Sequence, residues 1–299
     1  MKNRTRTASI ALAAVFSASA LIQAGGQAAP EASAATEQGS IVLLGDSVLA
    51  NPAYAQILTK GFGPVPGLAA SPGTESVQAP MNSEYLPNCA HSENTVGATL
   101  QSRGHEVYDF TCAGAGILKK QDRIEDLNEQ VDELVAQGRV SDNSRVFINI
   151  GFNDVASPEN LPASKDADYV AQVSEQIDKI RSIAPGAKIS MVTYPVIAEG
   201  PLGLVCPLRV APDSKMPMTI PAFPVKLAED RLEARARQVA EAKGLGVVDA
   251  RAASAGKNSC GPDAERWVAA GIDVPAENEI YFHLTDVGIN GVADLIEQA

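Results

Sequence analysis

Residues 41–47 of the chain read IVLLGDS, four apolar residues followed by glycine, aspartate and serine. A short apolar run of this kind is typical of a strand that is buried on both faces of a parallel sheet. The glycine ends the strand, and a helix is predicted to begin at Ser47. Ligands of open parallel sheets bind beyond the carboxyl ends of the strands, so Ser47 is expected at such a crevice. A helix cap formed by Asp46 or Ser47 is the alternative.

The rest of the chain alternates strand and helix patterns. Strands are predicted at residues 41–44, 105–110, 145–150, 188–194 and 245–248. Helices are predicted from residue 47 and at residues 91–102, 122–137, 169–183, 224–243 and 286–297. This alternation predicts an α/β fold with a parallel sheet of about five strands and helices on both faces. Two long loops, residues 60–88 and the proline-rich residues 195–224, interrupt the pattern.

Composition and charge exclude several classes of protein. Of 299 residues, 45% are hydrophobic and 20% charged, as in a folded globular protein. The formal net charge is −12, and no basic cluster follows the first six residues. Binding to phosphates requires clustered Lys and Arg, so no nucleic-acid partner is expected, and anionic membrane surfaces are disfavoured.

The amino terminus has the layout of a secretory signal peptide. Lys2, Arg4 and Arg6 precede an apolar run over residues 8–22, and small residues follow at 32–34. We predict a signal peptide over residues 1–34 and a single domain over residues 35–299, although an earlier cleavage site is also compatible. About fifteen apolar residues are too few for a stable membrane anchor. The protein is therefore expected outside the cell or in the cell envelope.

The four cysteines are expected to pair in an oxidising compartment. Four cysteines allow three connectivities. Cys89 and Cys112 flank a helix-then-strand segment, while Cys206 and Cys260 lie in loop-like stretches, so we favour Cys89–Cys112 and Cys206–Cys260. Because no CxxC motif occurs, a redox or zinc site has little support, and no metal is predicted.

Three further features coincide with predicted strand ends or helix starts. Gly114 lies in a glycine-rich turn after the second strand, and Asn153 lies in GFND, residues 151–154, after the third. Each is also compatible with an ordinary turn. The chain has three histidines, and His283 directly precedes the last helix, where it can act as a base or merely as a cap or packing residue. His91 and His105 are expected away from the crevice.

The ordered set Gly45-Asp46-Ser47, Gly114, Gly151-x-Asn153-Asp154 and His283 resembles the SGNH or GDSL family of esterases and lipases. The stretch from Cys89 through Ala115 is most similar to the secreted actinobacterial branch. The resemblance covers nearly the whole mature chain. It implies a flavodoxin-like three-layer α/β/α sandwich and hydrolysis of carboxylic esters without cofactor or metal.

The resemblance also implies roles for the residues it matches. Ser47 would form an acyl-enzyme with His283 as base, and the amides of Ser47 and Gly114 with the Asn153 side chain would form the oxyanion hole. Asp46 and Asp154 are expected to brace their turns. The chain departs from the family pattern at Ile280, where relatives usually have the aspartate that orients the histidine.

Two orienting groups for His283 therefore remain, the backbone carbonyl of Ile280 and the carboxylate of Glu279. Two other functions also remain: an inactive envelope-binding protein on the same scaffold, and an acyltransferase to an envelope acceptor. The expected substrate is a small-molecule, lipid or glycan ester, whose pockets the two long loops would line. We expect a monomer.

Overall fold

The computed structural model describes residues 39–52, 83–118, 125–210, 218–273 and 280–299. At its centre lies a five-stranded sheet in the order β2-β1-β3-β4-β7, with every neighbouring pair parallel. The strands are β1 (Ile41–Gly45), β2 (Val107–Asp109), β3 (Arg145–Asn149), β4 (Lys188–Val192) and β7 (Gly246–Val248). The five-stranded parallel sheet predicted from the sequence is confirmed.

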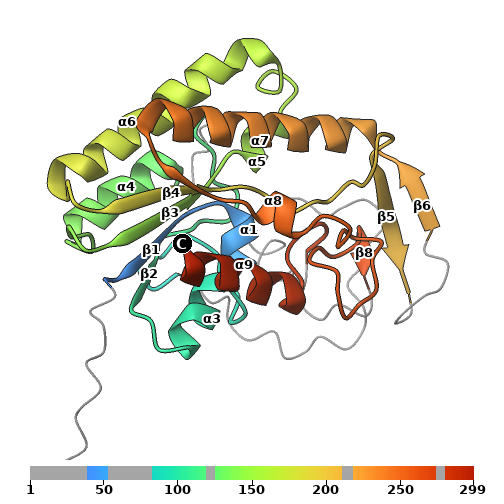
Figure 1. Cartoon of the computed structure of the whole chain (residues 1–299), viewed down its shortest axis with the longest axis horizontal. Coiled ribbons are helices and arrows are strands. Elements are labelled where there is room, and N and C mark those ends of the chain that lie inside the picture. The colour runs from blue at the N-terminus through green and yellow to red at the C-terminus, as the bar shows by residue number, and fades with distance from the viewer. Residues whose placement is uncertain (1–38, 53–82, 119–124, 211–217, 274–279) are drawn as a thin grey trace, which may run out of the picture. The chain divides into compact units, whose positions relative to one another are not determined.

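Helices cover both faces of this sheet (Figure 1). The longer helices are α3 (Val96–Ser102), α4 (Leu127–Ala136), α6 (Asp166–Ile183), α7 (Phe223–Lys243) and α9 (Asp286–Gln298). Helices α4, α6 and α7 lie on one face, and α3 and α9 on the other. Short helices α1 (Ser47–Ala50), α5 (Phe152–Val155) and α8 (Ala250–Ala253) and the 3₁₀ turn η1 (Ala163–Lys165) complete the described helical elements.

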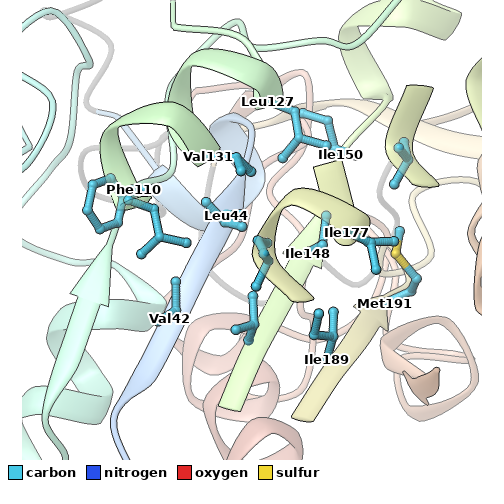
Figure 2. Packing of buried hydrophobic residues seen from close by; sticks show 14 of the residues in the cluster. Val42, Leu44, Phe110, Leu127, Val131, Ile148, Ile150, Ile177, Ile189 and Met191 are labelled. Atoms are coloured by element: carbon cyan, nitrogen blue, oxygen red, sulfur yellow. The ribbon is translucent and has the colours of Figure 1, made fainter. Parts of the chain in front are cut away.

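The pleat of β1 supplies side chains to both hydrophobic cores. Val42 and Leu44 pack with α4 and α6, and Figure 2 shows them among the side chains of this cluster. Ile41 and Leu43 belong to the second cluster, together with residues of α3 and α9. Since successive side chains of a strand point to opposite faces, a strand between two helical layers must be apolar throughout. This requirement explains the continuous apolar run.

Several predicted boundaries shift. The helix predicted to start at His91 begins at Val96, because the Thr95 side chain accepts a hydrogen bond from the Ala98 amide at 2.9 Å and caps it. The predicted helix at residues 122–137 is α4, which begins at Leu127. The predicted signal peptide and most of the loop at residues 60–88 fall outside the described residues.

The proline-rich excursion at residues 195–224 is not only loop. It contains β5 (Leu204–Arg209) and β6 (Met218–Pro221), which form a second sheet with β8 (Ile272–Asp273) in the order β6-β5-β8. Prolines at positions 207 and 221 made these segments read as loop in the sequence. Pro221 is the last residue of the edge strand β6, and Pro207 lies where the pairing register of β5 and β6 shifts. Proline is tolerated at such positions because no ladder hydrogen bond is lost.

Candidate active site

The turn that carries Ser47 follows the central strand directly. β1 ends at Gly45, Asp46 caps α1, and Ser47 is the first residue of that helix. A Cβ atom at Gly45 would lie 2.2 Å from the carbonyl oxygen of Asn149 on the neighbouring strand, so only glycine fits. Ser47 is buried, with 7% of its surface exposed. The close approach of two strand ends thus places the serine at the carboxyl edge of the sheet.

Asp46 connects this turn to two other elements. Its carboxylate accepts hydrogen bonds from the amides of Val48 at 3.1 Å and Phe152 at 3.2 Å, and from the Tyr194 hydroxyl. Burial raises the pKa of Asp46 to about 7, and these hydrogen bonds oppose the rise. These contacts match the expectation that Asp46 braces its turn. The Tyr194 hydroxyl also accepts a hydrogen bond from the Phe152 amide at 3.2 Å.

Gln130 of α4 holds the other side of the turn. Its Oε1 accepts the Gly45 amide and its Nε2 donates to the Gly45 carbonyl, both at 2.8 Å. Sequence reasoning missed Gln130 and Tyr194. The signal for Gln130 was a polar residue between Leu127 and Val131, inside the apolar stripe of a predicted helix. Tyr194 ended a predicted strand but carried no motif.

Asn153 and Asp154 hold the turn that contains Gly114. The Asn153 side-chain amide donates to the Ala115 carbonyl at 2.8 Å, and the Asp154 carboxylate accepts the amides of Ile117 and Leu118 at 2.8–3.2 Å. An amide nitrogen carries two hydrogens, and this bond uses one of them. Gly114 is buried with φ +93°, a conformation that favours glycine. The structure therefore brings the Asn153 and Gly114 blocks together.

His283 meets the serine. Its Nε2 lies 2.7 Å from Ser47 Oγ, and its Nδ1 lies 2.9 Å from the backbone carbonyl oxygen of Tyr281. A carbonyl can only accept, so Nδ1 carries the proton and Nε2 presents its lone pair to the serine hydroxyl. This tautomer is the one required of a general base.

The expected orienting carbonyl of Ile280 was wrong by one residue. The Ile280 carbonyl accepts the backbone amide of His283 at 3.3 Å, and the Tyr281 carbonyl faces the imidazole instead. The reason lies in Phe282, whose left-handed backbone (φ +59°) turns the preceding carbonyl towards the ring. Glu279, the other candidate, lies outside the described residues.

Backbone contacts fix the segment around His283. The His283 carbonyl accepts the Ala269 amide at 2.8 Å, and the Thr285 amide donates to the Trp267 carbonyl at 3.0 Å. The Thr285 side chain then caps α9 by accepting the Gly288 amide at 3.1 Å. Burial lowers the pKa of His283 to about 4, only partly opposed by the bond to Tyr281. The imidazole is therefore neutral at pH 7.

The two remaining histidines have other partners. His91 Nε2 lies 2.5 Å from the Thr111 carbonyl, and His105 Nε2 lies 2.8 Å from a carboxylate oxygen of Glu297 on α9. His283 is thus the histidine that contacts a serine hydroxyl.

Both predicted cysteine pairs form. The Cα atoms of Cys89 and Cys112 lie 4.7 Å apart, and those of Cys206 and Cys260 lie 5.1 Å apart. Within the described residues, one group has the spacing of metal ligands, namely Cys89, Cys112 and Glu125. Its two sulfurs are joined to each other, so neither offers a thiolate. In the described part of the chain, every helix is too short or too polar to span a membrane.

A serine hydroxyl within hydrogen-bonding distance of a histidine, at the carboxyl edge of a parallel sheet covered by helices, is an arrangement that serine hydrolases use. The sequence profile of the GDSL-like Lipase/Acylhydrolase family matches residues 43–288, and the chain belongs to this family. It is accordingly a carboxylic ester hydrolase.

Solved structures share the fold. An extracellular lipase from Streptomyces rimosus is 18% identical with a TM-score of 0.51, and a phospholipase A1 from Streptomyces albidoflavus is 16% identical with a TM-score of 0.53. In each case the similarity covers 87% of this chain and 99% of the other. Among curated proteins, none matches the sequence.

Proposed function

We propose that the protein is an exported serine ester hydrolase that works through an acyl-enzyme on Ser47. The observation that carries this proposal is the 2.7 Å contact between Ser47 Oγ and His283 Nε2. It joins a serine and a histidine that are 236 positions apart in the sequence. The low pKa of the imidazole favours the neutral form, which can accept the serine proton.

The first half of the proposed reaction acylates the serine. His283 Nε2 accepts the Ser47 proton while Ser47 Oγ attacks the ester carbonyl carbon. The amides of Ser47 and Gly114 and the Asn153 side chain stabilise the resulting oxyanion. His283 then returns the proton to the leaving alcohol as the carbon–oxygen bond breaks. The Tyr281 carbonyl, bonded to Nδ1, keeps the ring oriented and stabilises its charged form.

The second half releases the acid. Water gives a proton to His283 Nε2 and attacks the acyl carbon, and the proton then returns to Ser47 Oγ. A sugar hydroxyl in place of water would make the same acyl-enzyme an acyltransferase. The ratio of released acid to acylated acceptor separates these outcomes, and a panel of esters with increasing acyl length defines the acyl pocket.

Ser47→Ala tests the proposal. We expect it to abolish both hydrolysis of a short-chain aryl ester and labelling by a fluorophosphonate probe, because the attacking oxygen is gone. Ser182→Ala is the matched control, since Ser182 is an exposed serine of α6 whose hydroxyl donates to the Lys179 carbonyl at 2.7 Å. Undiminished activity of the Ser47 variant would refute the assignment.

Export is part of the proposal. The signal-like amino terminus and the two disulfides support it, because disulfides persist in oxidising compartments. Amino-terminal sequencing of the protein recovered from the culture medium tests it, with an expected new terminus after Ala34.

A further inference from the structure

The Tyr281 carbonyl orients the imidazole of His283 but belongs to the same short segment. It lies two residues before the histidine, so the two groups move together if the segment moves. In the part of the chain that the structure describes, no carboxylate bonds the imidazole from another element. The position of the segment relative to Ser47 must therefore be fixed by contacts outside it.

Residues 266–270, which we call the backing strip, make those contacts. Two backbone hydrogen bonds and an antiparallel bridge join the strip to the segment around His283. The Thr285 hydroxyl adds a bond to the Arg266 carbonyl at 2.6 Å. Because these bonds attach to the backbone of the histidine and its neighbours, a displacement of the strip displaces the imidazole.

Helix α9 lies against the backing strip on one side. A Cβ atom at Gly288 would lie 2.1 Å from the Trp267 carbonyl oxygen, and one at Gly291 would lie 2.2 Å from the Trp267 ring. Only glycine at these two positions allows the helix and the strip to approach so closely. Helix α9 therefore limits movement of the strip in one direction, and another contact must limit it elsewhere.

A buried ion pair ties the strip to β8. The guanidinium of Arg266 binds both carboxylate oxygens of Asp273, one through Nη1 and the other through Nη2 at 3.0 Å. Nη1 also donates to the Val268 carbonyl at 3.4 Å, and the Asp273 carboxylate accepts the Ala270 amide at 2.8 Å. The side chains of Arg266 and Asp273 are each 3% exposed. One ion pair thus holds the start, the middle and the end of the strip.

The same guanidinium is anchored to the small sheet of β6, β5 and β8 (Figure 1). Arg266 Nε donates to the Asp263 carboxylate at 2.7 Å, and the same oxygen accepts a bond from Arg209 of β5 at 2.9 Å. β5 pairs with β8 and also carries one cysteine of the disulfide Cys206–Cys260. Arg266 therefore connects the backing strip to a cross-linked part of the molecule.

These contacts require an arginine. A guanidinium is planar and presents its N–H donors in fixed directions, and Arg266 uses all three of its nitrogens on two carboxylates and a carbonyl. A lysine would keep the charge but has a single nitrogen, so it could not make these bonds together. Loss of one partner from a buried ion pair leaves the other charge without compensation. The strip is therefore held in one arrangement.

We propose that Arg266 is a positioning residue for His283: it holds the backing strip where the imidazole lies within reach of the Ser47 hydroxyl. The proposal rests on the proposed function, in which His283 is the base, and it adds a residue that touches no reacting atom. Proton transfer needs a heavy-atom distance of about 2.6–3.2 Å, and the observed contact is 2.7 Å. A displacement of about 1 Å can cost about a hundredfold in rate.

Arg266→Lys tests the proposal by steady-state hydrolysis of a soluble short-chain aryl ester, at a temperature where circular dichroism shows the variant folded. We expect kcat to fall at least about tenfold while KM stays within about twofold, because Arg266 contacts neither the serine nor the oxyanion hole. Asp263→Ala is a milder second variant, since its side chain is 24% exposed and Arg266 keeps its bonds to Asp273. It should lower kcat about threefold.

A second readout separates positioning from a general loss of structure. In a His283→Ala background, Arg266→Lys should cause no further decrease of the residual rate, because the base that it positions is absent. Arg235→Lys is the matched control. Arg235 of α7 is equally buried and its Nε donates to Asp166 at 2.8 Å, but it lies away from the strip. This control should lose stability towards urea to a similar extent and keep its kcat.

Three outcomes would overturn the proposal. The first is an unaltered kcat in the folded Arg266 and Asp263 variants. The second is a decrease by the same factor with and without His283, and the third is an equal loss of kcat in the Arg235 control. Full activity of His283→Ala, or absence of ester hydrolysis by the unmodified protein, would instead contradict the proposed function.

Discussion

The turn that carries Ser47 is held by side chains from several elements in addition to backbone bonds such as that from the Asp46 amide to the Asn149 carbonyl, whereas the imidazole of His283 is positioned mainly by backbone groups. Asp46, Gln130 and Tyr194 come from three different elements and all support the serine turn. The histidine ring is oriented by the Tyr281 carbonyl, and its own carbonyl is held by the Ala269 amide. The serine turn can therefore be weakened one side chain at a time, while the contacts of the histidine turn persist through most substitutions.

The two turns share one electrostatic property. Burial favours the neutral form in both, so it raises the pKa of Asp46 and lowers that of His283. When the pH falls, the raised pKa of Asp46 makes the folded protein more stable, whereas the lowered pKa of His283 makes it less stable. Four predictions test the comparison, beginning with the largest expected effect.

Gly45→Ala should be the most damaging change. Its Cβ atom would meet the Asn149 carbonyl oxygen at 2.2 Å, so two paired strands would have to separate. We expect a loss of at least about 3 kcal/mol in the free energy of unfolding, measured by urea denaturation. Gly104→Ala is the control, because Gly104 has φ +93° but open space at its Cβ position, and it should lose about 1 kcal/mol. Similar losses in both variants would contradict the explanation by contact.

The second prediction concerns pH. The stabilising contribution of His283 is complete above its ordinary pKa of 6.5 and is lost as the pH falls towards about 4. That of Asp46 is complete below pH 3.8 and is lost as the pH rises towards about 7. Between pH 7 and pH 4 the two contributions change by about 3 kcal/mol in opposite directions and largely cancel.

The variants His283→Gln and Asp46→Asn should reveal these contributions separately. Relative to the unmodified protein, the first should gain stability on acidification from pH 7 to pH 4 and the second should lose it, each by about 3 kcal/mol. Chemical denaturation at the two pH values measures both. If both variants gain stability on acidification, or both lose it, the pKa values of Asp46 and His283 are not shifted in opposite directions.

Tyr194→Phe should have an intermediate effect. It removes the hydroxyl that donates to Asp46, and a bond to a charged group contributes about 2 kcal/mol to stability. We also expect kcat to fall while KM changes little, because Asp46 holds both the Ser47 and the Asn153 turns. The measurements are denaturation and ester hydrolysis at pH 8, where the carboxyl is ionised.

Tyr169→Phe is the matched control for Tyr194. The Tyr169 hydroxyl is also buried, but it donates to the uncharged carbonyl of Ile150 at 2.7 Å, so its loss should cost about 1 kcal/mol. If the Tyr169 variant is as unstable and as slow as the Tyr194 variant, the hydroxyl at Asp46 has no special role.

Glu279→Gln should have the smallest effect, less than about twofold on kcat/KM, because the Tyr281 carbonyl already occupies the hydrogen-bonding position at Nδ1. Steady-state kinetics on a soluble ester measure it. A drop of about a thousandfold or more would make Glu279 the orienting group and would reverse the contrast between the two turns.

The fold could be predicted largely from local patterns. The apolar run at residues 41–44 and the largely apolar stretch at residues 145–150 contain the buried strands β1 and β3, because a central parallel strand faces core on both sides. Helix starts were less accurate, since a single cap such as Thr95 decides them. The small sheet was missed because β5 and β6 are short and contain prolines, so their alternation is too weak to distinguish from loop.

The sequence by itself determined the order of the large-sheet strands and of the longer helices, and it marked Ser47, Gly114, Asn153 and His283 near their ends, because glycine and small polar residues at such places leave a local signal. Only the tertiary structure decided which carbonyl faces the imidazole and which side chains brace Asp46 and Gly45. Every residue carries a carbonyl, so no residue type can mark the one that is used. Contacts such as those of Gln130 and Tyr194 depend on elements that meet only after folding.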